Sequence, residues 1–256
     1  MPVTFPAHQG LIAPVKLRWP NAIDATALCI GAAAPDLAYP FGTWLGSQSH
    51  TAIGLAVWSI PFTMVAAVVV RWRAASGIFA AMPDLGPLRL KSYRVLGRRR
   101  PRMAATLSSA VLGAGSHVLI DGFTHSRRFG AKSLSWDEVL FTIPIRGEFT
   151  AARVLQHLGH VVGSVSFVVV LAIIASSGRL ERWYGADAVE ADRRTRLSAR
   201  QRRSFWIATA LPALVAVGYV VLARRAGTFL PISVFTLSLL CAGATLGEIL
   251  ERGSSK

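Results

Sequence analysis

Long apolar runs separated by polar, mostly basic stretches dominate the chain. A helix needs about 20 apolar residues to cross a lipid bilayer. Five runs reach about this length, and they lie at residues 51–72, 104–123, 157–177, 204–223 and 229–250. The pattern predicts an all-α, polytopic transmembrane helical bundle with five spans. Pro61 interrupts the first run and is expected to kink that helix.

The N-terminal part has a weaker apolar pattern. Residues 21–37 are mildly apolar, include Asp24 and end in A-A-A-P-D. Two interpretations stay open, a short span or one arm of a re-entrant hairpin that the protein covers. We prefer the hairpin, because its arms would bring His8 and Asp36 to the same side of the bundle.

Three parts follow from this pattern. Residues 1–177 form a membrane domain, 178–203 a basic cytoplasmic loop, and 204–256 a C-terminal pair of transmembrane helices joined by a turn at 224–228. Residues 71–102 form another basic loop, whose pieces 77–83 and 88–96 either lie flat on an anionic leaflet or are solvated. Residues 124–156 form a longer polar loop with room for a short interfacial helix.

Composition supports a membrane protein and argues against nucleic-acid binding. The chain is 52% hydrophobic and carries a net charge of +15, with a mean hydropathy of +0.45. Its basic residues gather in the loops between apolar runs, as in membrane proteins. We therefore expect membrane lipids and no nucleic acid as partners. The first ten residues do not resemble a signal peptide, and Cys29 and Cys241 are expected to be buried thiols.

The distribution of Lys and Arg also predicts the orientation. The loops 71–102 and 178–203 and the C-terminal tail hold nineteen Lys and Arg, whereas the loops 124–156 and 224–228 hold seven. The richer set is expected on the cytoplasmic side of the cell membrane. The end of the 104–123 helix then lies on the extracytoplasmic side.

Ionisable residues at the ends of the predicted helices are candidates for a metal site. His117, Asp121 and His125 are spaced i, i+4 and i+8, so a continuous helix places them on one face. The predicted topology brings all six histidines and Asp36 to the extracytoplasmic side. Imidazole and carboxylate groups without cysteine suit Zn²⁺, as one ion or two, with Mn²⁺ or Fe²⁺ as alternatives.

The predicted site has metal ligands and catalytic residues. The metal ligands are His8, Asp36, His50, His117, Asp121, His157 and His160, and the catalytic residues are Asp121 and His125. Structural roles stay open for some of them: His50 as an interfacial cap, Asp36 as a turn cap, and the pair at 157 and 160 as polar contacts between helices.

Several motifs resemble known families. M-P-V-T-F-P-A-H, G-A-A-A-P-D, S-H-T, S-H-V-L-I-D-G-F-T-H and L-Q-H-L-G-H, over residues 1–177, resemble an uncharacterised bacterial multi-pass membrane family. That family is similar to proteins classed as membrane-bound metal-dependent hydrolases. The ligand order also shows a distant likeness to zinc-dependent phospholipase C, including fourteen residues between Asp36 and His50. The H-x-x-x-E of those enzymes is absent, since position 161 is Val161.

The resemblance and the candidate ligands together imply a metal-dependent hydrolase of a lipid or membrane-associated ester or phosphodiester. Two other interpretations use the same residues. One is a transporter or ion-handling protein in which the His/Asp cluster relays ions or protons, and the other is a structural membrane protein. A common centre for the side chains would favour hydrolysis, whereas a polar track along the bundle would favour transport.

Overall fold

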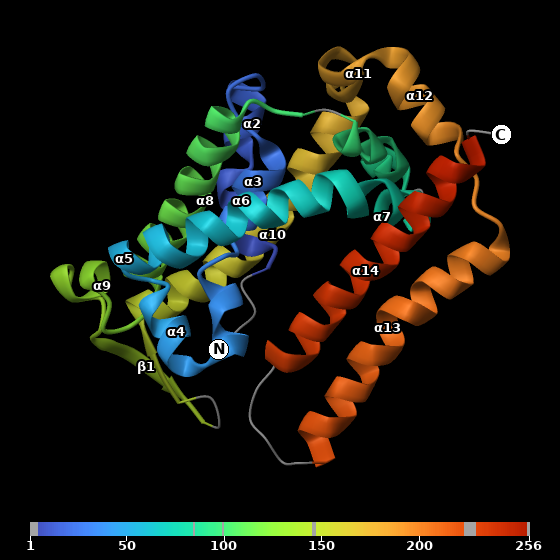
Figure 1. Cartoon of the computed structure of the whole chain (residues 1–256). Helices are drawn as coiled ribbons and strands as arrows, with labels where there is room; N and C mark the ends of the chain where they lie inside the picture. The colour runs from blue at the N-terminus through green and yellow to red at the C-terminus, as the bar shows by residue number, and fades with distance from the viewer. Residues whose placement is uncertain (1–4, 84, 99, 145–146, 223–228, 255–256) are drawn as a thin grey trace. The chain divides into compact units, whose positions relative to one another are not determined.

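The computed structural model describes residues 5–83, 85–98, 100–144, 147–222 and 229–254. Within this part of the chain helices predominate, and the strands form one two-stranded sheet (Figure 1). The predicted all-α bundle is therefore confirmed. The 224–228 turn falls in a segment outside the described residues.

Five helices in the described residues are long and apolar enough to cross a membrane. They are Ala52–Ala81, Met103–Thr124 (α8), Ala151–Ser176 (α10), Ala199–Leu222 (α13) and Leu230–Arg252, the last lying within α14 (Phe229–Ser254). The predicted spans are thus confirmed. The first helix continues past residue 72 into the segment that we expected to be a basic loop.

This first long helix is built from several consecutive segments. It contains α5 (Ala52–Gly54), α6 (Ile60–Val69) and α7 (Ala75–Ala81). Two wider π-helical turns join them, η2 (Leu55–Ser59) and η3 (Val70–Ala74). The first of these turns lies directly before Pro61, which has no N–H to donate to the preceding turn.

The chain folds into two compact units. The first unit contains the described residues of Met1–Ala38, Trp44–Met64 and Met103–Val170, and the second those of Tyr39–Thr43, Val65–Arg102 and Leu171–Lys256.

Short helices make up the N-terminal part of the chain. They are α1 (Ala7–Ile12), α2 (Pro14–Arg18) and α3 (Ala25–Gly31), followed by the 3-10 helix η1 (Asp36–Phe41) and α4 (Thr43–Gln48). With seven residues, α3 is too short to cross a bilayer, so residues 21–37 do not form a helical span.

Asp24 connects α3 to α8. Its carboxylate caps α3 by accepting hydrogen bonds from the backbone N–H groups of Thr26 (3.1 Å) and Ala27 (3.3 Å). It also accepts one from the Thr106 hydroxyl at 2.8 Å, while the Asp24 N–H donates to the Ser109 hydroxyl at 2.9 Å. This buried polar contact fixes where α3 begins along α8.

Glycines allow the backbones of the first unit to approach closely. A Cβ at Gly113 of α8 would overlap the backbone carbonyl of Leu28, and one at Gly31 of α3 would lie 2.8 Å from the carbonyl oxygen of Ala110. Gly10 of α1 and Gly163 of α10 form a second contact of this kind. Small residues are common where membrane helices pack this closely.

The 124–156 segment has more regular structure than expected. It contains the short helix α9 (Phe129–Ser133) and an antiparallel hairpin of β1 (Val139–Ile143) and β2 (Gly147–Thr150). Phe141 and Phe149 stack across this hairpin with ring centroids 5.1 Å apart. A short helix was anticipated here, whereas the strands were not.

The second unit contains most of the basic segments, and several of them are folded. Two short 3-10 helices, η4 (Gly86–Leu88) and η5 (Leu90–Gly97), follow α7, and two α-helices, α11 (Arg179–Tyr184) and α12 (Ala186–Arg194), follow α10. The 178–203 segment is thus largely helical. Cys241, expected to be buried, is exposed on α14, whereas Cys29 is half-buried.

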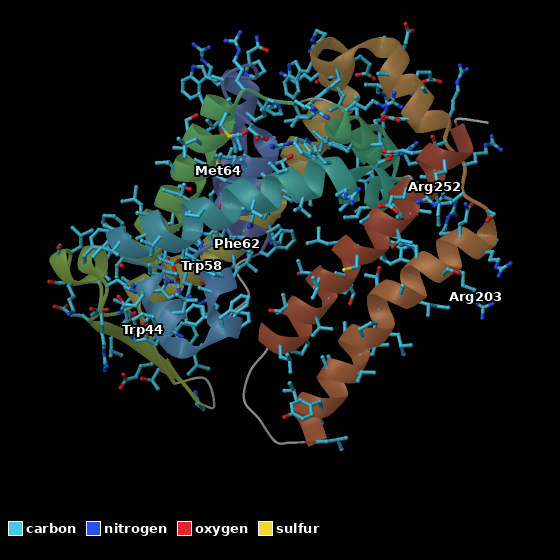
Figure 2. All side chains as sticks on the ribbon, in the orientation of Figure 1. Trp44, Trp58, Phe62, Met64, Arg203 and Arg252 are labelled. Atoms are coloured by element: carbon cyan, nitrogen blue, oxygen red, sulfur yellow. The ribbon has the colours of Figure 1, made fainter. Side chains whose placement is uncertain are left out.

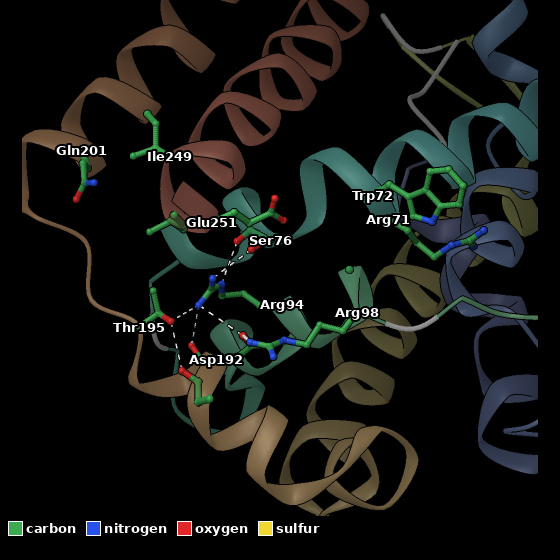
Figure 3. A pocket seen from close by; sticks show the side chains of 13 residues that line it. Arg71, Trp72, Ser76, Arg94, Arg98, Asp192, Thr195, Gln201, Ile249 and Glu251 are labelled. Carbon is green, nitrogen blue, oxygen red and sulfur yellow. Dashed lines mark hydrogen bonds and ion pairs between the residues drawn. The ribbon is translucent and has the colours of Figure 1, made fainter. Parts of the chain in front are cut away.

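The 88–96 piece packs partly into the second unit. Tyr93, Arg94 and Val95 are buried, and the Tyr93 hydroxyl donates to the carbonyl oxygen of Leu171 at 2.7 Å. Arg94 donates to the Ser76 carbonyl oxygen and lies beside Asp192, which also binds Arg98 (Figure 3). Burial lowers the pKa of the Arg94 guanidinium, and the Asp192 carboxylate opposes this change.

The close contact between α3 and α8 gives a test of the fold. Gly113→Ala should destabilise the protein by about 1–3 kcal/mol, because its Cβ would overlap backbone atoms that cannot rotate away. Gly115→Ala on the same helix is the matched control, because a Cβ there meets no atom within 4 Å. Thermal unfolding in detergent measures both. Equal midpoints for the two variants would show that the approach of α3 to α8 is not tight.

Candidate metal centre

One face of α8 carries the first two donors. His117 and Asp121 are separated by one helical turn and are both buried. The Nε2 atom of His117 lies 3.5 Å from Oδ2 of Asp121. The i, i+4 spacing in the sequence therefore puts a nitrogen and an oxygen side by side, as predicted.

Two further donors reach this pair from the N-terminal part of the first unit. Asp36 begins η1, and His50 lies between α4 and α5. His50 Nε2 is 3.3 Å from His117 Nε2, 3.4 Å from Asp36 Oδ1 and 3.7 Å from Asp121 Oδ2. His117 Nε2 is 3.6 Å from Asp36 Oδ1. We call Asp36, His50, His117 and Asp121 the four-donor group.

The spacing within the four-donor group fits a metal ion. All four donor atoms lie within 4.8 Å of one another. Around a tetrahedral Zn²⁺ with bonds of about 2.0–2.1 Å, neighbouring ligand atoms are about 3.3–3.4 Å apart. The separations of 3.3–3.7 Å given above are close to this edge length. Two imidazole nitrogens and two carboxylate oxygens are also donors that Zn²⁺ accepts.

Backbone carbonyls orient both imidazoles of the group. His117 Nδ1 lies 2.8 Å from the carbonyl oxygen of Ala32, and His50 Nδ1 lies 2.9 Å from that of Gly46. A carbonyl oxygen can only accept, so each Nδ1 carries the proton and donates. Each Nε2 then presents its lone pair to the shared centre, the arrangement found around metal-binding histidines.

The loop that carries Asp36 is held on both sides. The Ser49 hydroxyl donates to the carbonyl oxygen of Pro35 at 2.7 Å, and Trp58 Nε1 donates to that of Ala34 at 3.0 Å. Trp58 itself stacks on Phe62 with ring centroids 5.2 Å apart (Figure 2). These contacts fix the backbone next to Asp36, and the A-A-A-P-D pattern alone does not reveal them.

Two more histidines face the other oxygen of Asp121. His8 Nε2 and His125 Nδ1 each lie 3.3 Å from Asp121 Oδ1. The His8 ring stacks on the His117 ring with centroids 4.2 Å apart. Gln156 of α10 contacts His125 Nε2 at 2.7 Å. Asp121 thus lies between the four-donor group and this second pair of imidazoles.

Comparison with protein-family models assigns this chain to a family. Residues 1–249 match the model described as a domain of unknown function, DUF4184. The chain belongs to the DUF4184 family. No curated protein and no solved structure gives a significant match. The predicted membership of an uncharacterised family of membrane-like proteins agrees with this result.

The last two predicted ligands of the DUF4184 chain lie outside the four-donor group. His157 is exposed, and its Nδ1 atom contacts the carbonyl oxygen of Arg153 at 2.7 Å. His160 is half-buried and lines a small pocket together with His8 and His125. The side chains of His157 and His160 point in different directions from α10. A helix turns by about 100° per residue, so two residues that are three positions apart differ by about 60° around the helix axis.

Several residues around the centre were not identified from the sequence. Gln156, Ser49 and Trp58 contact ligands or the loop that carries them, and Asp24 sets the position of α3. Asp24 carried a usable signal, because Asp before an apolar stretch is a common helix N-cap. The other three are ordinary residue types whose importance depends on contacts distant in sequence.

Metal analysis tests the centre. After zinc loading and desalting, His117→Ala should retain about one ion per chain fewer than the unmodified protein, because it removes a donor of the four-donor group. His157→Ala should retain the full amount, since this exposed histidine is not among the four donors. Inductively coupled plasma mass spectrometry gives the ratio. Equal zinc content in His117→Ala and the unmodified chain would contradict a metal site here.

Proposed function

We propose that this DUF4184 protein is a metal-dependent hydrolase that uses Zn²⁺ to cleave a lipid or another membrane-associated ester or phosphodiester. The observation that carries the proposal is the four-donor group, in which nitrogens and oxygens from separate segments all lie within 4.8 Å of one another. Burying such a group of ionisable side chains in apolar surroundings costs free energy, and ionisable residues in membrane helices usually have a function.

The accessibility of the side chains supports a reactive rather than a purely structural ion. The side chains of His117 and His50 are 0% and 1% exposed, whereas those of Asp36 and His125 are 21% and 22% exposed. The cluster is therefore closed to solvent at His50 and His117 and accessible to solvent beside Asp36 and His125. A substrate carbonyl or phosphoryl group would approach from this open side.

The residues present suit hydrolysis. A bound Zn²⁺ supplies a Lewis acid and lowers the pKa of a coordinated water toward neutrality. Asp36, His50, His117 and Asp121 would hold such an ion, with both imidazoles kept in one tautomer by backbone carbonyls. We propose that His125 takes part in the hydrolytic reaction. Its side chain borders the solvent-accessible side of the cluster and contacts Asp121, and it is not one of the four donors.

The position of the centre along α8 favours a substrate at the membrane surface. His117 is seven residues before the helix end at Thr124, which corresponds to about 10 Å. Asp121 and His125 lie nearer to this end of the helix, which is the end closer to the lipid headgroups and their ester and phosphodiester bonds. The distribution of basic residues among the loops supports an extracytoplasmic location for this end of α8.

Transport is a weaker interpretation of the same residues. A relay along the bundle requires a continuous series of polar groups. Between Ser109 and His117, the buried positions of α8 are Ala110, Gly113 and Ala114, none of which has a polar side chain. A purely structural role is also weaker, because the polar side chains converge on one point instead of pairing separately between helices.

Activity measurements test the proposal. Zinc-loaded protein in detergent should hydrolyse at least one of a panel of fluorogenic carboxylic esters, phosphodiesters and vesicle phospholipids. His125→Ala should lower kcat by about 10²–10⁴-fold, the range observed for groups that assist at the reacting centre. His157→Ala is the control and should keep its rate. Zinc-loaded protein that is inactive on every member of the panel would argue against hydrolysis.

Labelling tests the orientation. In a background with Cys29 and Cys241 replaced by Ala, Ser133→Cys in intact cells should react with a membrane-impermeant maleimide, because α9 follows the proposed extracytoplasmic end of α8. Ser198→Cys, an exposed position between α12 and α13, should react only after the cells are opened. The opposite pattern would place the centre at the cytoplasmic surface.

A further inference from the structure

A cavity in the second unit is lined by arginines (Figure 3). It has a volume of about 850 Å³, and its lining residues include Arg71, Arg94 and Arg98. Arg71 belongs to η3, Arg94 belongs to η5, and Arg98 directly follows η5. The end of α12 and the end of α14 supply further lining residues. A cavity of this volume can hold a small molecule or a lipid headgroup.

The described lining residues carry more positive than negative charge. Asp192 is 1% exposed, and two guanidinium groups share its carboxylate. Arg98 donates to Asp192 Oδ1 at 2.6 Å and to Oδ2 at 3.1 Å, and Nη1 of Arg94 lies 3.6 Å from Oδ1. Arg71 adds a third positive charge to the lining, and Glu251 adds a second negative one. The balance therefore favours an anion in the cavity.

Arg98 can donate to such an anion. Its Nε and Nη2 atoms are used by Asp192, so Nη1 is left for another acceptor. The Arg98 side chain is 55% exposed, so an anion can reach this nitrogen. Burial lowers the pKa of Arg94, Asp192 raises it, and the neighbouring charge of Arg98 lowers it again. A bound phosphate would offset the repulsion between the two cations and accept charge-assisted hydrogen bonds.

An apolar groove adjoins this cavity. It lies between α13 and α14, which pack side by side (Figure 1), and it has a volume of about 590 Å³. Gln201 and Ile249 line both the groove and the cavity. On α14 the groove extends from Leu237 to Ile249, which corresponds to about 18 Å of helix. One leaflet of a bilayer has a similar depth, since the whole hydrocarbon core is about 30 Å thick.

We propose that the cavity and the groove together bind an anionic phospholipid, with its phosphate beside Arg98 and one acyl chain between α13 and α14. A polar compartment that continues into an apolar one matches the two parts of a lipid, whereas a soluble phosphate compound would leave the groove unfilled. The arginines lie in segments that the distribution of basic residues predicts on the cytoplasmic side, where the leaflet carries a negative surface potential.

This lipid site is independent of the proposed hydrolysis. Its lining residues all belong to the second unit, and none of them is a member of the four-donor group. The lipid would be a bound partner of the helices and not a substrate. Loss of metal should therefore leave lipid binding unchanged.

Native mass spectrometry of the full chain in a neutral detergent tests the site. Delipidated protein should bind phosphatidylglycerol at least about tenfold more tightly than phosphatidylcholine with the same acyl chains, because only the first carries a net negative charge. Arg98→Gln should weaken binding of phosphatidylglycerol about fivefold, the effect expected of one arginine beside an anionic lipid.

Arg194→Gln is the matched control for Arg98→Gln. It removes the same charge from an exposed position of α12 that is not among the described lining residues of the cavity, so it should bind phosphatidylglycerol normally. An equal effect of the two substitutions would overturn the site. Equal affinity of the unmodified chain for the two lipids would overturn it as well, and that comparison does not depend on the folding of any variant.

A second pair of variants distinguishes a lipid from other occupants. Ala208→Phe puts a large side chain into the groove and should weaken phosphatidylglycerol binding severalfold, because the acyl chain loses its contacts there. Ile207→Phe, at the neighbouring exposed position of α13, should bind normally. Inorganic phosphate should not displace the lipid.

Two outcomes would replace the lipid by another occupant. Displacement by inorganic phosphate, together with normal lipid binding by Ala208→Phe, would overturn the proposal in favour of a soluble phosphate compound. A dimer of the unmodified chain that Ala208→Phe dissociates would overturn it in favour of a second copy of the chain in the groove.

Discussion

The interaction on which the site depends is the contact between the buried carboxylate of Asp121 and the imidazoles around it. A carboxylate removed from water is expensive unless opposite charge or hydrogen-bond donors compensate it. Asp121 meets His117 and His50 through one oxygen and His8 and His125 through the other. The segments that carry His8 and His50 are consequently held to one residue of α8.

Close backbone packing makes these contacts possible. Short imidazole and carboxylate side chains meet only when the segments that carry them approach within a few ångströms. Gly31 and Gly113 let α3 lie directly on α8, so that the carbonyl of Ala32 reaches His117. Gly10 and Gly163 do the same for α1 and α10, which places His8. The glycines are therefore as much a part of the site as its ligands.

The sequence revealed the parts of the structure that depend on local pattern. Apolar runs of sufficient length predicted the five long helices, and the i, i+4 spacing predicted the pair of His117 and Asp121. Residue type and predicted topology were enough to bring Asp36 and His50 toward that pair. The same reasoning included His157, because the start of a helix can be predicted more easily than the direction of a side chain on it.

Parts that depend on packing could not be predicted. The strands β1 and β2 lie in a segment that appeared only polar, and the basic 88–96 piece is buried through Tyr93 and Arg94. Hydrogen bonds from Ser49, Trp58 and Gln156 connect residues that are well separated along the chain. No periodicity marks such residues, because each is defined by a partner in another segment.

The spread of the ligands along the chain has a consequence for biosynthesis. The centre takes residues from His8 to Asp121, so the ribosome must complete α8 before the earliest donor has its partners. Until then, the N-terminal helices carry polar groups with nothing to neutralise them. Formation of this His/Asp cluster is thus a late event in assembly, because its N-terminal members wait for the synthesis of α8.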